Sequence, residues 1–309
     1  MNSLLLEDLQ AIKAKPVLKW AGGKSQLLPQ INNYLPEKIK NREITRYIEP
    51  FIGGGAVFFD LISKYNMMES FLVDKNPELI ILYNAIKSDV YALIEELEKV
   101  CKEYQAFNSK CDYYYKMREE YNLFNKAVNT GIRDKYFIRR AALTVFLNKT
   151  CFNGLYRVNK DGKFNVPIGS YSNPKIYDKE ELINVALAFK NATLICGDFE
   201  QAKRYINKNS FIYYDPPYRP VSKTSAFISY TSHDFDDQSQ KRVKTFFDEA
   251  HNKGAYQMLS NSDPTNYSDD YFFDELYKDY HIHRIYAKRY IRAKGKQDIR
   301  ELLITNYIK

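Results

Sequence analysis

Apolar residues alternate between strand-like and helix-like spacing along the first hundred positions. A short apolar run at 46–51 predicts a buried strand that ends at three consecutive glycines, and a helical pattern follows at 56–65. A second strand is expected at 69–74. Asn76-Pro77 then marks the start of a long helix, whose apolar positions recur at helical spacing. This order of strands and helices is typical of a parallel α/β sheet.

The pattern changes in the middle of the chain and returns towards its end. From about 103 to 149 the sequence is rich in Tyr, Lys and Arg, with helical spacing and no strand signal. Asp161-Gly162, flanked by strand-like residues, predicts a hairpin turn. Strand spacing returns in five segments, at 192–198, 211–215, 255–260, 281–290 and 301–307. We therefore expect one α/β domain, at 1–102 and 190–309, interrupted by a helical and hairpin insertion at 103–189.

The charge balance suggests a polyanionic partner without establishing one. The 309 residues include 46 Lys and Arg against 38 Asp and Glu, a formal net charge of +8. Nucleic acid is the commonest partner of such a chain, although many Lys-rich proteins bind no polyanion. The 27 Tyr and 19 Phe suit base stacking, but most aromatic residues belong to a core. Composition alone therefore leaves both interpretations open.

The cysteines and the N-terminus exclude several classes of protein. Cys101, Cys111, Cys151 and Cys196 form no C-x-x-C pair and have no neighbouring His cluster, so we expect no metal site and no disulfide framework. The short apolar run at the N-terminus is followed by acidic residues and by no cleavage-site pattern. No apolar stretch reaches the length needed to span a bilayer. A cytoplasmic protein with reduced thiols is the expectation.

The three glycines and an acidic residue after the next strand indicate a nucleotide-like ligand. Glycines at 53–55 let the main chain approach a ligand where a Cβ would clash. Asp74 ends the following strand, where a carboxylate can accept hydrogen bonds from both hydroxyls of a ribose. These features fit both NAD and S-adenosylmethionine, and a plain tight turn is the alternative. The spacing departs from G-x-G-x-x-G, which disfavours an oxidoreductase.

The tetrapeptide Asp215-Pro216-Pro217-Tyr218, here called the DPPY segment, predicts chemistry on an exocyclic amine. It directly follows a buried apolar strand, at the sheet edge where α/β proteins bind ligands. The lone pair of such an amine is delocalised into its ring, and two hydrogen-bond acceptors would make the nitrogen more nucleophilic. Asp215 and the Pro216 carbonyl can supply these acceptors, on a main chain stiffened by proline, and Tyr218 offers a ring face for an extruded base.

The remaining step would be in-line attack of the amine on a sulfonium methyl group, with geometry and polarisation as the main catalytic terms. No covalent enzyme intermediate is required, and no cysteine stands in a matching Pro-Cys context. A rigid strand-end turn with a buried tyrosine is the structural alternative for the DPPY segment. The glycines and Asp74 upstream favour the catalytic interpretation.

Six stretches, in this order, resemble the Dam-type DNA adenine-N6 methyltransferases with the alpha order of motifs: PVLKWAGGKSQLLPQI, YIEPFIGGGAVFFDL, VDKNPELIILY, FNGLYRVNKDGKFNVPIGSY, GDFE and DPPY. More narrowly, the chain is similar to the adenine methyltransferases of GATC-specific restriction–modification systems. The resemblance runs from Pro16 to Tyr307 and implies a Rossmann-like methyltransferase sheet with an inserted target-recognition domain. It also implies S-adenosylmethionine as methyl donor, no metal, and double-stranded DNA as substrate.

The resemblance assigns a set of cofactor contacts. Trp20 lies near the methionine end of the cofactor, although a core anchor is the alternative for the only Trp in the chain. Asp74 is the ribose-binding acid, and Asp198 accepts from the cofactor amine while Phe199 packs on its ring. Asp215 matches both a catalytic and a cofactor-site residue. The full set is Trp20, Gly23, Lys24, Pro50, Gly53, Gly55, Asp74, Asp198, Phe199 and Asp215.

The resemblance also assigns DNA contacts, at Lys19, Phe152, Asn153, Leu155, Arg157 and Asn159. Arg157 suits a bidentate contact with O6 and N7 of guanine, and Lys19 matches a lysine that touches a guanine edge. Phe152 and Leu155 suit a wedge in the base stack that a flipped adenine vacates. For each basic residue the alternative is a phosphate contact, which carries no sequence information.

Two departures from the family bear on the recognition sequence. Ser170 stands where relatives often carry Arg, and the segment KRYIRAKGKQDIREL lacks the expected Asn-Gly loop, although its basic residues from Lys288 to Arg300 suit phosphates. We expect methylation within GATC by a monomer, with a cognate restriction endonuclease as a candidate partner. The alternatives are methylation of RNA adenine or of cytosine N4, and a DNA-binding module without catalysis.

Overall fold

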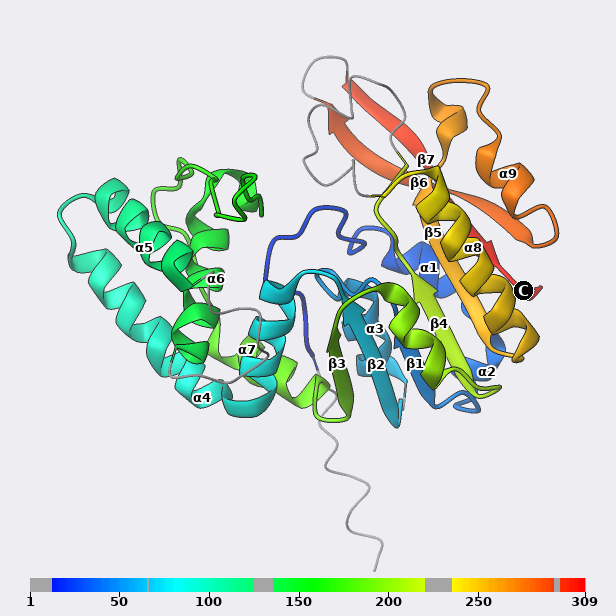
Figure 1. Cartoon of the computed structure of the whole chain (residues 1–309), viewed down its shortest axis with the longest axis horizontal. Helices are drawn as coiled ribbons and strands as arrows, with labels where there is room; N and C mark the ends of the chain where they lie inside the picture. Colours follow the sequence, from blue (N-terminus) through cyan, green and yellow to red (C-terminus); the bar gives the residue numbers. More distant parts are fainter. Residues whose placement is uncertain (1–12, 66, 125–135, 220–234, 292–294, 309) are drawn as a thin grey trace, which may run out of the picture. The chain divides into compact units, whose positions relative to one another are not determined.

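The computed structural model describes residues 13–65, 67–124, 136–219, 235–291 and 295–308 (Figure 1). The chain divides into two compact units, each built from three stretches of sequence. The first unit comprises Met1–Gly23, Gly53–Lys64 and Asn76–Cys196, and the second comprises Lys24–Ile52, Tyr65–Lys75 and Gly197–Lys309. The N-terminal apolar run, and the side chains at 287–298 with most of the expected basic cluster, lie outside what is described.

The second unit is built on a mixed sheet whose strands run in the order β2-β1-β4-β5-β7-β6. The strands are β1 (Arg46–Glu49), β2 (Glu69–Asp74), β4 (Ser210–Tyr214), β5 (Tyr256–Ser262), β6 (His281–Ile291) and β7 (Gly295–Thr305). β1 pairs in parallel with both β2 and β4, and β4 pairs in parallel with β5. β7 is antiparallel to β5 and to β6. The predicted parallel α/β sheet is confirmed, with an antiparallel pair added at one side.

Helices of the second unit cover this sheet with aromatic side chains. α8 (Asp237–Asn252) lies along β4 and β5 in Figure 1 and begins at Asp236, whose side chain accepts from the amide of Ser239. Phe246 and Phe247 of α8 are buried and contact the ring of Tyr214. The other helices of this unit are α1 (Leu28–Asn33), α2 (Glu37–Lys40), η3 (Phe199–Tyr205), η6 (Pro264–Asn266) and α9 (Phe272–Leu276).

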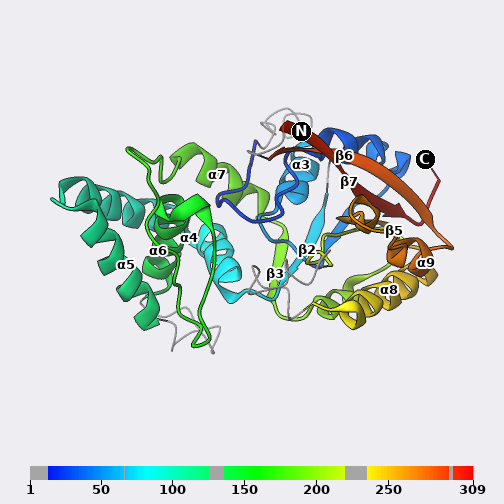
Figure 2. The same cartoon turned by 90° about the horizontal axis from the view of Figure 1, so that it is seen from above.

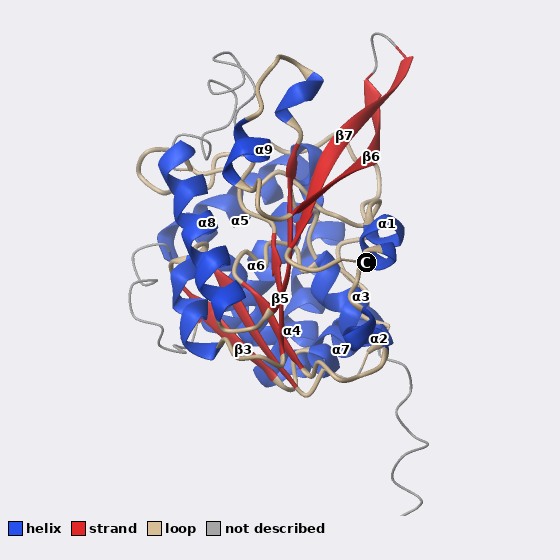
Figure 3. Ribbon diagram, turned by 90° about the vertical axis from the view of Figure 1, so that its right-hand side faces the viewer, coloured by secondary structure: helices blue, strands red, loops and turns tan. Residues whose placement is uncertain are grey.

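β6 and β7 form a long two-stranded ribbon that continues past the rest of the sheet (Figure 3). Their pairing extends from His281 opposite Thr305 to Ile291 opposite Gly295, whereas β5 pairs only with the residues of β7 from Glu301 onwards. The sequence predicted the last strand only from 301. Its first six residues, GKQDIR, are mostly polar and give no apolar signal, so their strand conformation depends on pairing with β6.

The first unit is mainly helical. Its elements are α3 (Ala56–Lys64), α4 (Pro77–Ala106), α5 (Lys110–Phe124), α6 (Phe137–Thr150), η2 (Phe152–Gly154), α7 (Lys179–Ala188) and β3 (Ala192–Cys196). Figure 2 shows α4, α5 and α6 packed beside one another. Asn76 caps α4 by accepting from the amide of Glu78, as the Asn-Pro pair predicted. Non-helical backbone angles at Asp89 kink this helix.

A buried ion pair joins α4 to α6. The guanidinium of Arg140 bonds both carboxylate oxygens of Glu78, with Nε 2.8 Å from Oε2, and both side chains are almost fully buried. Removing one partner of such a pair typically costs about 3–5 kcal/mol, because it leaves the other charge buried and alone. Since neither residue was predicted to act on a substrate, we assign this pair to the stability of the unit.

The expected hairpin follows α6 in the first unit. Val158 and Phe164 form an antiparallel bridge, and Gly162, with φ of +74°, donates to the carbonyl of Asn159. The side chain of Asn159 accepts from the amides of Asp161 and Lys163 and so closes the turn. The prediction of a turn at Asp-Gly is therefore confirmed. In the described part of the chain, no helix has the length and apolarity needed to cross a membrane.

Candidate active site

The DPPY segment leaves the carboxyl end of β4 at the point where the strand order reverses. β1 lies beside β4, and the chain continues from β1 to β2 on one side and from β4 to β5 on the other. Such a switch point is where open α/β sheets bind ligands. Pro216 is buried and Asp215 is partly buried. The buried amide of Gln240 donates to the Pro217 carbonyl at 3.0 Å and holds the main chain of the segment.

The carboxylate of Asp215 is held by a lysine and a serine from distant parts of the second unit. Lys24 Nζ lies 2.7 Å from each carboxylate oxygen, and Ser260 Oγ donates to Oδ1 at 3.1 Å. Ser260 in turn accepts from the hydroxyl of Tyr213 at 2.9 Å. A carboxylate has roughly four lone-pair positions. Among the described residues, Lys24 and Ser260 account for three of them, so one acceptor position remains for a substrate.

Burial raises the pKa of Asp215, while the ammonium of Lys24 and the hydrogen bond from Ser260 oppose that rise. Lys24 is only 3% exposed, so its charge acts through a poorly screened environment. An ionised carboxylate only accepts hydrogen bonds, whereas protonation makes one of its oxygens a donor. The lysine therefore favours the form of Asp215 that can polarise an amine.

The ring of Tyr218 is fixed from two directions. Its hydroxyl donates to Glu301 Oε2 at 2.7 Å, and Lys24 Nζ lies 4.7 Å from the ring centroid. Burial and the neighbouring carboxylates of Asp215 and Glu301 raise the pKa of Tyr218 well above its ordinary value, so the phenol stays a neutral donor. The sequence pattern did not predict a role for Glu301. Its only signal is an acidic residue that begins the otherwise apolar run ELLI.

A further buried acid, Glu49, lies at the end of β1. It is 2% exposed and accepts from the hydroxyl of Tyr47 at 2.9 Å. Burial raises its pKa well above the ordinary value, and the charges of Asp215 and Asp74 add to this effect. Sequence reasoning assigned no role to Glu49, although a glutamate inside a buried strand is a signal in itself. Lys24 is the cation that faces this group of acids.

Acidic and aromatic residues at the ends of β1 and β2 suit an adenosine moiety. Asp74 ends β2, and its carbonyl accepts from the amide of Gly197. Next to Gly197, Asp198 caps η3 through the amide of Glu200. The buried ring of Phe199 stacks on Phe51, with ring centroids 5.0 Å apart. Pro50, also predicted as a cofactor contact, is buried directly after β1.

Arg242 of α8 was not predicted, yet it contacts two of the predicted cofactor residues. Its guanidinium lies 4.8 Å from the Phe199 ring centroid, and one nitrogen lies 3.0 Å from Asp198 Oδ1. These residues fit the chemistry of S-adenosylmethionine, with an acid for the ribose and a second acid and a ring for the adenine. No group of three or more His, Cys, Asp or Glu within the described ranges has a metal-binding arrangement.

In the first unit, the glycines close on the side chain of Trp20. A Cβ at Gly53 would lie 3.2 Å from Trp20 Cδ1, and one at Gly54 would lie 3.1 Å from Trp20 Cβ. Gly53 and Gly55 also have positive φ values, of +45° and +73°. The exposed Gly23 donates to the Trp20 carbonyl. A side chain at position 53 or 54 would therefore crowd Trp20, and the backbone conformation at Gly53 and Gly55 favours glycine.

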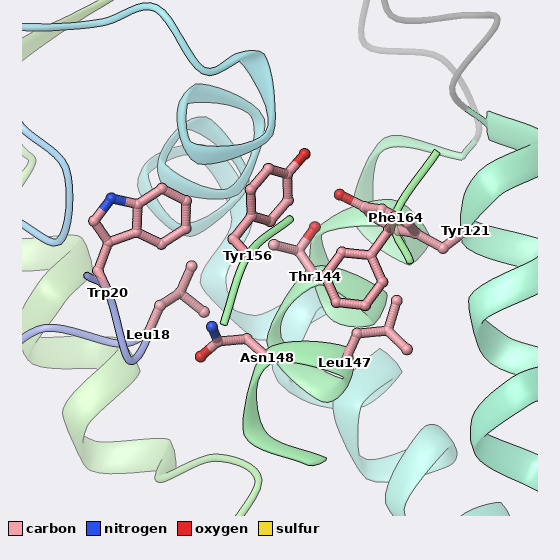
Figure 4. Close-up of a pocket in the computed structure, with 8 residues that line it drawn as sticks. All are labelled: Leu18, Trp20, Tyr121, Thr144, Leu147, Asn148, Tyr156 and Phe164. Atoms are coloured by element: carbon pink, nitrogen blue, oxygen red, sulfur yellow. The ribbon is translucent and has the colours of Figure 1, made fainter. Parts of the chain in front are cut away.

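Trp20 also lines a small pocket of the first unit (Figure 4). Its ring lies 5.5 Å from that of Tyr156, which precedes Arg157 in the hairpin. The other lining residues are Leu18, Tyr121, Thr144, Leu147, Asn148 and Phe164. The indole of Trp20 therefore packs against both the glycines at 53–54 and Tyr156 of the hairpin, in addition to its predicted ligand contact.

The residues predicted to contact DNA lie on and beside the hairpin, and most are exposed. Phe152 is 50% exposed and Leu155 is 40% exposed, so both apolar side chains are accessible to a partner. Arg157 is exposed, and its Nε donates to Asn165 Oδ1 at 2.7 Å. Asn153 is exposed with φ of +55°. The structure therefore gathers these predicted residues in one unit, together with Lys19.

A family model and several curated relatives each match most of the chain. A family model described as D12 class N6 adenine-specific DNA methyltransferase matches residues 20–291. The chain is 47% identical over 301 residues to the Type II methyltransferase M.MjaIII of Methanocaldococcus jannaschii, covering 96% of this chain and 100% of that protein. It is 40% identical over 301 residues to the Type II methyltransferase M1.LlaDCHI of Lactococcus lactis subsp. cremoris, covering 96% of each. Over 294 residues it is 32% identical to a DNA adenine methylase of Vibrio cholerae serotype O1, covering 94% and 95%.

Proposed function

The chain belongs to the D12 class of N6 adenine-specific DNA methyltransferases, and from this premise we propose that it methylates adenine within GATC after flipping the base out of duplex DNA. The enzyme class and the Rossmann-like α/β fold follow from the family. S-adenosylmethionine is the methyl donor that the family implies. Beyond the family, we propose the target sequence, base flipping and the role of each residue.

The observation that carries the proposal is the coordination of Asp215. Lys24 and Ser260 fix its carboxylate and leave one acceptor position, which suits a single N–H of the adenine amine. The Pro216 carbonyl takes the second N–H, while Gln240 occupies the Pro217 carbonyl. Two acceptors draw the nitrogen towards a tetrahedral geometry with a localised lone pair. When bound, S-adenosylmethionine would supply an electrophilic methyl group on sulfur: the N–C bond would form as the S–C bond breaks, S-adenosylhomocysteine would leave, and one amine proton would pass to solvent.

Tyr218 provides the surface on which the flipped base stacks. Glu301 holds the phenol hydroxyl and Lys24 lies over the ring, so the orientation of the ring is set before the base arrives. Such preorganisation reduces the ordering required in the transition state. Stacking on a neutral aromatic ring and hydrogen bonds at N6 together select adenine by shape and by its amine.

The cofactor contacts that we propose fall into two groups. In the second unit, Asp74 binds the ribose, Asp198 and Phe199 bind the adenine, and Lys24, Pro50 and Asp215 complete the set. Support comes from the buried Phe199 ring and from the cap that orients Asp198. In the first unit, Trp20, Gly23, Gly53 and Gly55 are proposed from family resemblance. The close approach of Gly53 to the indole gives that glycine a structural role as well.

We assign recognition of the DNA sequence to the insertion at 103–189, together with Lys19. Arg157 and Lys19 contact guanine edges, and Phe152 and Leu155 enter the stack beside the flipped adenine. The exposure of the two apolar side chains and the proximity of Lys19 to the hairpin support this assignment. Asn153 and Asn159 complete the predicted contacts, the latter through its place in the turn. Relatives named as Type II methyltransferases support a restriction–modification role, with a monomer acting on DNA in the cytoplasm beside a cognate endonuclease.

The test is a methylation assay with the purified full chain and labelled S-adenosylmethionine. Duplexes of equal length contain GATC, contain a single altered base pair in it, or lack it, and an RNA duplex is assayed beside them. We expect label only in DNA with GATC and N6-methyladenine as the modified nucleoside. N4-methylcytosine, labelled RNA, or equal labelling of all duplexes would each contradict the proposal.

A further inference from the structure

A buried asparagine of α6 connects the two segments that carry the proposed guanine contacts of the first unit. Asn148 is 4% exposed, and its side chain makes three hydrogen bonds. It accepts from the amide of Lys19 at 2.9 Å and donates at 2.9 Å to the carbonyls of Lys19 and Gly154. Asn148 and Leu18, the residue before Lys19, line the same pocket (Figure 4). One side chain thus ties a segment near residue 19 to the beginning of the hairpin.

The side chain of Lys19 packs directly against Gly154, where the hairpin begins. Gly154 has φ of +65°, and a Cβ there would lie 2.5 Å from Lys19 Cδ and 2.6 Å from Lys19 Cβ. At its far end, the ammonium lies 4.5 Å from the ring centroid of Tyr171 and 3.3 Å from its hydroxyl. The backbone of Lys19 is therefore fixed by Asn148, and its stem runs over Gly154 to the Tyr171 ring. A lysine held in this way loses less conformational entropy when it meets a base edge.

The other arm of the hairpin has a separate anchor of the same chemical kind. Asn122 of α5 accepts from the amide of Phe164 at 2.8 Å and donates to its carbonyl at 3.1 Å. The next residue, Asn165, accepts from Arg157 Nε. The two predicted guanine contacts, Lys19 and Arg157, therefore depend on different asparagines within the same unit.

We propose that Asn148 is a specificity-positioning residue that acts through Lys19, and that Asn122 has the corresponding role for Arg157. The inference rests on the proposed function, because it concerns how the same enzyme reads DNA. Asn148 itself touches no base, and it holds the Lys19 backbone and the Gly154 turn in register. Loss of Asn148 relaxes discrimination at the base pair read by Lys19, and loss of Asn122 relaxes discrimination at the base pair read by Arg157.

The experiment first maps the preferred site of the wild-type enzyme by sequencing methylated random duplexes. The value of kcat/KM is then measured on that site and on every single-base-pair variant of it, for wild type, K19A, N148A, R157A and N122A. We expect N148A to reproduce the pattern of K19A, with about 5- to 150-fold less discrimination at one base pair, and N122A to reproduce that of R157A at another. The K19A/N148A double variant should lose little more than K19A alone, because the two residues act as a unit.

The outcomes separate this inference from the proposed function. A mapped site other than GATC would contradict the proposed target while the comparison of variants proceeds on the site that was found. Equal loss at every base pair for N148A, additive loss in the double variant, or the same pattern for N148A and N122A would overturn the inference. If N148A does not fold, N148D replaces it, since the carboxylate still accepts from the Lys19 amide but cannot donate to the carbonyls of Lys19 and Gly154.

Discussion

The proposed reaction centre around Asp215 in the second unit and the hairpin region of the first unit are each stabilised internally, by different chemistry. Around Asp215, buried charged and hydroxyl side chains bond one another, and Lys24 contacts both Asp215 and the ring of Tyr218. Around the hairpin, exposed side chains stand on a backbone that two asparagines bond directly. Electrostatic interactions are already strong in the first case, whereas in the second they become strong only when DNA excludes water.

This difference matches what catalysis and recognition of a DNA sequence each require. A reaction centre has to stabilise one arrangement of charge, so its groups are desolvated and paired before the substrate binds. A sequence-reading surface must keep its side chains available for base edges, so only the main chain beneath them is fixed. Substitutions in the reaction centre should therefore change kcat, and substitutions in the hairpin region should change the choice of site.

The largest effect is expected from D215A. Removing one of the two acceptors for the amine should lower kcat by at least about 10²–10³-fold, the range for loss of one polarising group. DNA affinity should survive, because the hairpin region is in the other unit. Single-turnover methylation and a DNA-binding titration measure the two quantities on the same sample. Parallel loss of both would mean that Asp215 acts mainly in folding.

The next largest effect is expected from K24M. Burial already raises the pKa of Asp215 and Lys24 opposes this rise, so loss of the ammonium should raise that pKa further. Activity needs the anion and falls as pH drops through this pKa. The acidic limb of the profile of kcat against pH, measured at saturating cofactor, should therefore move to higher pH in K24M.

In K24R the acidic limb should stay closer to its wild-type position, because the positive charge is kept. An unchanged profile in K24M would show that the ion pair does not control ionisation of Asp215, and the contrast between the two regions would weaken.

R157A addresses the hairpin side of the comparison. Its loss should cost about 1–3 kcal/mol of discrimination at one guanine, while kcat on the preferred site stays near the wild-type value. Rates on duplexes that differ at that base pair give the discrimination directly. If all duplexes bind more weakly by the same factor and the salt dependence falls, Arg157 contacts only phosphate.

The smallest effect is expected from E301Q. Glutamine still accepts from the hydroxyl of Tyr218, but the hydrogen bond loses its charged acceptor, a change of about 1–1.5 kcal/mol or roughly tenfold in kcat. Fluorescence of 2-aminopurine at the target position reports whether the base still leaves the helix. An unaltered kcat in E301Q, or a kcat in Y218F/E301Q well below that of Y218F alone, would contradict the assignment that Glu301 acts through the hydroxyl of Tyr218.

Much of the fold could be predicted because the parallel strands β1, β2 and β4 are short and mostly buried. The strand at 69–74 and the capped helix after it appear in the structure where the pattern placed them. β7 was predicted too short because Gly295–Arg300 is polar and takes its conformation from β6. The spacing of apolar residues indicates which positions are buried, whereas pairing between polar strands leaves no such pattern in the sequence.

The candidate site was predictable only where a motif concentrates its chemistry in consecutive residues. Asp215 and Tyr218 stand within one tetrapeptide. In contrast, Ser260 and Glu301 reach them from 45 and 83 positions away, in strands that carry other polar residues as well. Asn148 lies in helix α6, outside the motifs that predicted the site. All three side chains are buried and hydrogen-bonded, and the sequence pattern does not show which polar residues of an element are buried.

The position of β7 in the sheet sets the order in which the active centre can be completed. β7 is the last strand described along the chain, yet it lies between β5 and β6 rather than at an edge. Until it inserts, β6 has no neighbour in the sheet of the second unit, and the hydroxyl of Tyr218 lacks Glu301. A partly folded chain would therefore lack one of the two contacts that orient the ring of Tyr218, and we expect full methylating activity only after β7 has inserted. Completion of the proposed active centre is thus coupled to the insertion of the last described strand.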